Sequence, residues 1–77
     1  SGGVIKHGVT MKALKVLKCS DSSMWYRNKI GQIIPLVSEK VDYDFTRGPM
    51  YWSREDAGYK NIVCMNDVEV IEVDNEL

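Results

Sequence analysis

Five short segments rich in apolar, β-branched or aromatic residues run along the sequence, and turn-forming residues separate them. The segments are residues 11–19, 32–39, 50–55, 59–64 and 68–73. Runs of this length are typical of strands, because isolated helices shorter than about 12 residues are marginal in water. A chain of 77 residues has room for one core. We therefore predict a single all-β domain of five strands.

The connections between these segments differ in length. Residues 20–31 predict a long first loop, and residues 41–49 predict a second loop that ends in a Gly-Pro turn. Residues 56–58 predict a tight turn, and residues 65–67 a single turn. Pro35 interrupts the second strand and predicts an edge or bulge position, because proline cannot donate to a ladder.

The two ends of the chain lack the short apolar segments that predict strands in residues 11–73. Residues 1–10 have no clear period and begin with Ser-Gly-Gly, which is typical of a cloning remnant, so we predict a flexible arm there. Residues 74–77 form an acidic tail. The predicted domain therefore spans residues 11–73.

The net charge and the lengths of the apolar runs exclude some classes of protein. The net charge is −1, which disfavours a strongly basic protein that coats nucleic acid. No apolar run approaches the roughly 20 residues that span a bilayer, so we expect a soluble, cytoplasmic protein with no membrane partner. Residues 1–40 carry seven basic and two acidic side chains, whereas residues 41–77 carry three basic and nine acidic ones. In one domain this asymmetry predicts pairing of opposite charges across strands.

The sequence shows no catalytic set. A nucleophilic serine or cysteine needs an imidazole base, and the only histidine, His7, lies in the predicted arm. Cys19 and Cys64 stand near apolar residues, Leu17 before the first and Ile62 and Val63 before the second, which predicts reduced, core-facing thiols, with a single disulfide as the alternative. One histidine and two distant cysteines do not supply the four ligands of a structural zinc. We predict a protein that is not an enzyme and holds no metal or cofactor.

The order of loops resembles that of the SH3-like barrel, with its long first loop, second loop, tight hairpin and one-turn 3₁₀ segment. Residues 61–68 stand where an SH3 domain carries the stretch G-[YF]-[IV]-P-x-N-Y-V. Here Cys64 and Asp67 replace the proline and the tyrosine of that stretch. The resemblance implies a small five-stranded SH3-like barrel, whereas the two replacements disfavour binding of proline-rich ligands.

The chain is also similar to small SH3-like proteins of bacteriophages and prophages. The similarity rests on a Lys-rich first strand that ends in Cys-x-Asp at residues 19–21, on a Gly-led strand at residues 31–36 and on residues 51–72. Members of this group are accessory binding proteins. The resemblance implies a phage-encoded module that docks on a host or cellular protein and modulates or inhibits it.

Aromatic side chains concentrate in the two loops and the third strand. In an SH3-like barrel both loops flank one groove, so these side chains would meet there. Two or three of the seven would fill the core, and the others favour an interaction surface, because tryptophan and tyrosine dominate interface hot spots. The predicted partner-binding residues are Trp25, Tyr26, Arg27, Tyr43, Phe45, Arg47 and Trp52.

Two alternative functions remain open. A nucleic-acid-binding protein would use Lys12, Lys15, Lys18, Arg27 and Lys29, and residues 28–33 look like the end of the KOW motif of ribosomal proteins. Acidic residues in the same loops would repel phosphates, which favours a protein partner. The other alternative is a structural component of a phage particle.

Overall fold

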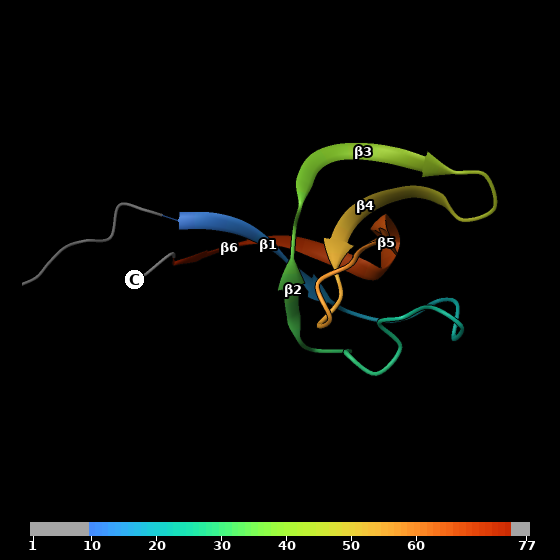
Figure 1. Ribbon diagram of the computed structural model, residues 1–77, viewed down its shortest axis with the longest axis horizontal. Helices are drawn as coiled ribbons and strands as arrows, with labels where there is room; N and C mark the ends of the chain where they lie inside the picture. Colours follow the sequence, from blue (N-terminus) through green and yellow to red (C-terminus); the bar gives the residue numbers. More distant parts are fainter. Residues whose placement is uncertain (1–9, 75–77) are drawn as a thin grey trace, which may run out of the picture.

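The computed structural model describes residues 10–74, which form two three-stranded antiparallel sheets (Figure 1). The elements are β1 (Thr10–Val16), β2 (Ile33–Pro35), β3 (Ser38–Asp44), β4 (Gly48–Arg54), β5 (Lys60–Cys64), the 3₁₀ turn η1 (Met65–Asp67) and β6 (Val68–Asp74). The sheets have the orders β2-β1-β6 and β3-β4-β5. The prediction of an all-β fold is confirmed. No helix of the described residues is long and apolar enough to cross a membrane.

The predicted second strand and second loop differ from the structure. Residues 32–39 are split between β2, which ends at Pro35, and β3, which begins at Ser38 in the other sheet. Proline lacks an N–H, so the ladder stops there, and the edge position predicted for Pro35 is confirmed. Residues 41–44, predicted as loop, continue β3, and Pro49 lies inside β4. The described chain therefore has six strands instead of five.

The small five-stranded SH3-like barrel that the resemblance implies is not confirmed, because backbone pairing within residues 10–74 does not close a barrel. The ladders join strands inside each sheet, and no ladder joins the two sheets. The predicted arm and tail fall outside the described residues, except that Thr10 begins β1 and Asp74 ends β6.

The core lies between the two sheets and under the first loop. Leu14 and Val16 of β1 are fully buried, as is Val63 of β5. Met24 and Tyr26 of the loop complete the same cluster. The loop is therefore part of the folded core, because two of its side chains fill the space between the sheets.

Opposite charges meet where β1 pairs with β6. Lys12 lies opposite Glu72 and Lys15 lies opposite Glu69 in this ladder. Such cross-strand pairs contribute a few tenths of a kcal/mol each, on the order of 0.2–1. The register therefore places basic residues of the first half opposite acidic residues of the second, although the ammonium of Lys12 forms its ion pair with Glu39, at 3.2 Å.

Candidate protein-binding hairpin

The first loop, residues 17–32, carries three of the predicted partner contacts, and two of them, Trp25 and Tyr26, fold back onto β5. The Trp25 indole nitrogen donates a hydrogen bond to the carbonyl of Ile62 at 2.8 Å, and the Tyr26 hydroxyl accepts one from the Cys64 N–H at 3.2 Å. β5 is an edge strand of its sheet. These side chains therefore satisfy backbone groups that the sheet leaves unpaired, and they protect its edge.

Tyr26 is fully buried, so it is not available as the surface contact predicted from the sequence. Its hydroxyl donates a hydrogen bond to the carboxylate of Asp67 at 2.6 Å. Ser20 donates to the same buried carboxylate from its N–H, at 3.0 Å, and from its hydroxyl. The backbone carbonyl of Asp67 also accepts the N–H of Leu17 at 2.8 Å. Asp67 thus fastens the first loop to η1.

The hydrogen bonds around Asp67 determine its ionisation. Burial alone would raise the pKa of Asp67, but the donors of Ser20 and Tyr26 outweigh it, so the pKa lies below its ordinary value. Burial and the neighbouring carboxylate raise the pKa of Tyr26. The pair therefore remains a carboxylate and a neutral phenol at neutral pH. The hydrogen bonds among Asp67, Ser20 and Tyr26 therefore stabilise the fold.

Three other predicted partner contacts form hydrogen bonds or ring contacts within the chain. The indole nitrogen of Trp52 donates to Asp42 of β3 at 2.8 Å. The guanidinium of Arg27 donates to the carbonyl of Met24, in its own loop, at 3.0 Å. Trp25 packs edge-on against the Tyr26 ring, at a centroid distance of 5.6 Å. Trp25 and Trp52 are half-buried, so each presents part of one ring to solvent.

The aromatic hairpin, which we define as residues 43–47 at the tip of β3 and β4, presents the remaining aromatic side chains to solvent. Tyr43 is 79% exposed and Phe45 is fully exposed. The Asp44 carboxylate accepts hydrogen bonds from the N–H and hydroxyl of Thr46, at 3.2 and 2.9 Å, and from the N–H of Arg47, at 2.9 Å. The turn that displays Phe45 is therefore fixed by its own side chains.

The sequence favours this turn geometry. Gly48, which follows the three turn residues, has φ of 83°, a left-handed conformation that glycine adopts without strain. A three-residue hairpin loop closed by a left-handed glycine is a common β-hairpin type. The hydrogen bond from the Thr46 hydroxyl and those from the turn N–H groups outweigh partial burial, so the pKa of Asp44 lies below its ordinary value.

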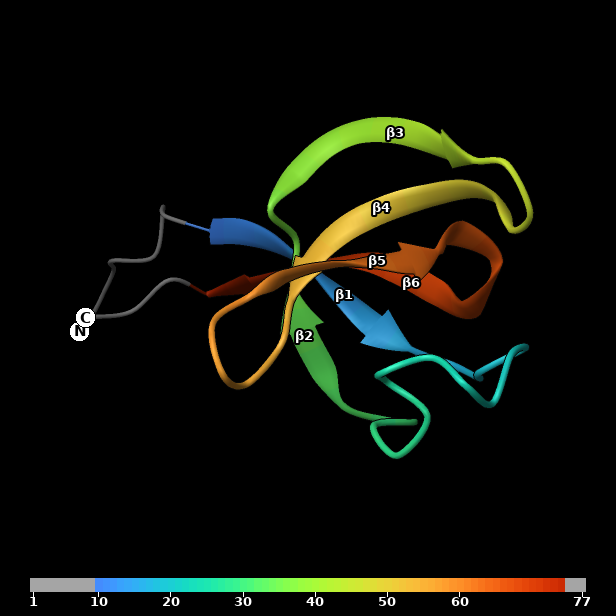
Figure 2. The same cartoon turned by 45° about the vertical axis from the view of Figure 1, so that its right-hand side comes forward.

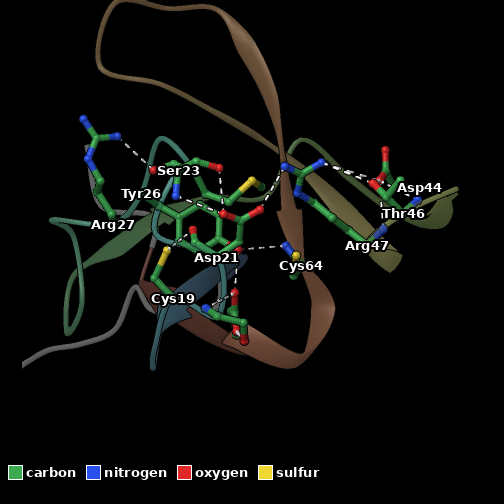
Figure 3. A network of polar contacts seen from close by, with 12 residues as sticks. Cys19, Asp21, Ser23, Tyr26, Arg27, Asp44, Thr46, Arg47 and Cys64 are labelled. Carbon is green, nitrogen blue, oxygen red and sulfur yellow. Dashed lines mark hydrogen bonds and ion pairs between the residues drawn. The ribbon is translucent and has the colours of Figure 1, made fainter.

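Arg47 joins the aromatic hairpin to the first loop (Figure 3). Its guanidinium donates to the Asp21 carboxylate at 2.9 Å and lies 3.7 Å from that of Asp44. The other oxygen of Asp21 accepts the N–H and the hydroxyl of Ser23, at 3.0 and 2.6 Å. These contacts confirm that the first loop and the β3–β4 turn lie side by side, and Figure 2 shows both on the same side of the molecule.

Sequence reasoning missed the three carboxylates that organise these contacts, namely Asp21, Asp44 and Asp67. Two of them had a detectable signal, because Asp-x-Ser and Asp-x-Thr are patterns in which a carboxylate binds the N–H two residues on. Asp67 had no such signal, since its partners Ser20 and Tyr26 are distant in the chain.

The cations proposed for nucleic acid binding lie close to acidic groups. Lys12 and Lys15 stand opposite carboxylates of β6. The ammonium of Lys29 lies 2.9 Å from the carboxylate of Asp56. Lys18 is exposed at the start of the first loop. Three of the five proposed cations therefore have a carboxylate opposite or beside them.

The two cysteines pack against the core as half-buried free thiols. Burial and the nearby carboxylate of Asp67 raise the pKa of Cys19, whose thiol donates to the carbonyl of Asp21 at 3.1 Å. Within residues 10–74 no group of three histidine, cysteine, aspartate or glutamate side chains is placed to hold a metal ion.

Comparisons of the chain with protein-family models, with curated proteins and with solved structures found no significant match. The candidate site therefore rests on the geometry of the described residues. Its elements are a fixed turn, two exposed aromatic rings and an ion pair that connects the turn to the first loop.

Proposed function

We propose that this chain is a non-enzymatic binding module with an SH3-like architecture, and that it docks on a host protein and modulates or inhibits it. The order of elements supports the architecture: a long loop follows β1, a hairpin joins β3 to β4, a tight turn joins β4 to β5, and a 3₁₀ turn precedes β6. In this proposal β2 and β3 are the two halves of one strand that bends from one sheet to the other.

The observation that carries the proposal is the complete exposure of Phe45 on a turn that Asp44 fixes. An isolated exposed ring is unremarkable on a protein surface, but Tyr43 stands two residues away and is also exposed. Aromatic anchors contribute most to binding when little freedom is lost on association. A rigid turn with two exposed rings fits this requirement.

The charges near the aromatic hairpin favour a protein over a nucleic acid. Arg47 is shared by the carboxylates of Asp21 and Asp44, so this cluster has one more negative than positive charge. Phosphate backbones are repelled by such a cluster, whereas an apolar pocket on a protein is not. The resemblance to phage SH3-like proteins supports a phage-encoded protein acting in the host cytoplasm.

Removing both exposed rings tests this function. The variant Tyr43→Ala/Phe45→Ala should fold normally and bind its partner at least about 30-fold more weakly, because interface hot spots cost about 2 kcal/mol or more. The immobilised chain first captures partners from a bacterial lysate, and calorimetry then measures the affinity for each purified partner. Tyr59→Ala is the matched control, since Tyr59 is 69% exposed on the β4–β5 turn, and it should bind normally.

Unchanged affinity of the folded double variant, or a lysate from which the chain retains no protein, would contradict the proposal. Binding of single-stranded DNA that weakens steeply with salt would support the nucleic-acid alternative instead. Self-association of the chain in sedimentation would favour the structural alternative.

A further inference from the structure

The guanidinium of Arg47 connects two segments that are far apart in the chain. Asp44 lies in the same turn, but Asp21 lies in the first loop, 26 residues earlier. The side chains of Arg47 and Asp21 are 32% and 40% exposed, so the pair is partly shielded from solvent. A contact of this kind can restrain one segment relative to the other.

Asp21 is held firmly on the side of the first loop. Its carboxylate accepts two hydrogen bonds from Ser23, and its carbonyl accepts the N–H of Met24 at 2.9 Å and the thiol of Cys19 at 3.1 Å. Met24 is itself a buried core residue. Asp21 is therefore a fixed point anchored to the core.

The aromatic hairpin, in contrast, extends beyond the core (Figure 1). None of the residues of β3 is fully buried, and the pairing of β3 with β4 is interrupted between Ser38 and Asp42. Beyond Met50, where the ladder between β4 and β5 ends, β3 and β4 pair only with each other, and an isolated two-stranded hairpin is marginally stable in water. The orientation of the hairpin therefore depends on polar contacts such as the one between Arg47 and Asp21.

We propose that Asp21 is a positioning residue for the aromatic hairpin. Through Arg47 it holds the Phe45 turn against the first loop, in the conformation that docks on the partner. This inference rests on the proposed function for its consequence, but the restraint itself is a property of the chain alone. Asp21 does not contact the partner in this arrangement.

Amide hydrogen exchange of the isolated chain, followed by NMR, tests the restraint. Asp21→Asn keeps the shape of the side chain and an oxygen for Ser23 but removes the charge. The amides of Thr46 and Arg47 should exchange about two- to five-fold faster in this variant, as expected for loss of a partly exposed ion pair. Amides of the β1–β6 ladder should be unaffected.

Further variants test whether the change in exchange is specific to the ion pair between Asp21 and Arg47. Asp56→Asn breaks a comparable ion pair, with Lys29 at 2.9 Å, and should leave exchange in the hairpin unchanged. Arg47→Gln removes the same ion pair together with the contact to Asp44, so it should speed exchange at least as much as Asp21→Asn does. Adding Asp21→Asn to Arg47→Gln should give no further increase, because the interaction that Asp21→Asn removes is already absent. Unchanged exchange at Thr46 in Asp21→Asn, or an equal rise in the β1–β6 ladder, overturns the proposal.

The consequence for docking is measured separately. Asp21→Asn should weaken binding of the captured partner by about the same two- to five-fold factor and should have no effect in the Phe45→Ala background. If exchange responds and binding does not, the restraint exists and the docking role of the hairpin is wrong. If exchange does not respond, Asp21 is not a positioning residue, whatever the partner binds.

Discussion

Replacement of Tyr26 by alanine is expected to lower the free energy of unfolding by about 3–5 kcal/mol, as for other large aromatic side chains removed from a core. Tyr26 is fully buried, and its loss also removes one of the three hydrogen bonds to the Asp67 carboxylate and the partner of the Cys64 N–H. The total stability expected for a chain of this length is on the order of 4–12 kcal/mol. The variant should therefore lose a large fraction of the total stability.

Urea denaturation followed by tryptophan fluorescence measures this loss. Tyr26→Phe keeps the ring and removes the hydroxyl, so it should cost about 1–3 kcal/mol. Tyr43→Ala removes the same kind of side chain from the exposed aromatic hairpin and should stay within about 0.5 kcal/mol of the wild type. A Tyr26→Ala chain as stable as Tyr43→Ala would show that Tyr26 is not the buried link described above.

Replacement of Asp67 by asparagine is expected to cost about 2–3 kcal/mol at neutral pH, because a buried acceptor of three hydrogen bonds becomes partly a donor. The loss should be accompanied by faster amide exchange at Leu17 and Ser20, whose N–H groups bind Asp67. Ser20→Ala, which removes one of the three donors, is the milder companion variant.

The same carboxylate makes stability depend on pH. The folded pKa of Asp67 lies below its ordinary value of 3.8, so the unfolded chain takes up the proton first as the pH falls. The stabilisation is fully present above the unfolded pKa and is lost as the pH falls through the folded pKa. Unfolding curves at pH 7, 4 and 3 should show a steeper decline for the wild type than for Asp67→Asn. Parallel declines would contradict this assignment, since Asp21 and Asp44 remain in both chains.

Some strands could be predicted from the sequence, because apolar residues alternate with polar ones along them or form a continuous apolar run. β5 and β6 show this pattern and were predicted close to their observed bounds. β3 was predicted in part as a loop, although residues 41–44 alternate apolar and polar side chains, because the polar and aromatic run ends in a Gly-Pro turn. No residue of β3 is buried, so the pairing of this edge strand with β4 decides its conformation.

The candidate site could be predicted only in part. The sequence indicated that aromatic side chains of the two loops would meet. The ion pair between Asp21 and Arg47 shows that the loops are neighbours, but among the described residues the aromatic ring pair, Trp25 with Tyr26, lies within the first loop. The sequence could not distinguish the buried Tyr26 from the exposed Tyr43, because both stand in segments that were predicted as loops. The difference comes from Asp67, which lies 41 residues after Tyr26 and accepts its hydroxyl.

Site-specific photo-crosslinking tests the central claim most directly, namely that the aromatic hairpin is the surface that meets a partner. A benzoyl-phenylalanine replaces Phe45 in one chain and Tyr59 in a matched chain, and both chains are irradiated with the purified partner. We expect a crosslinked product from position 45 and none above background from position 59. A product from position 59 without one from position 45 would contradict the account.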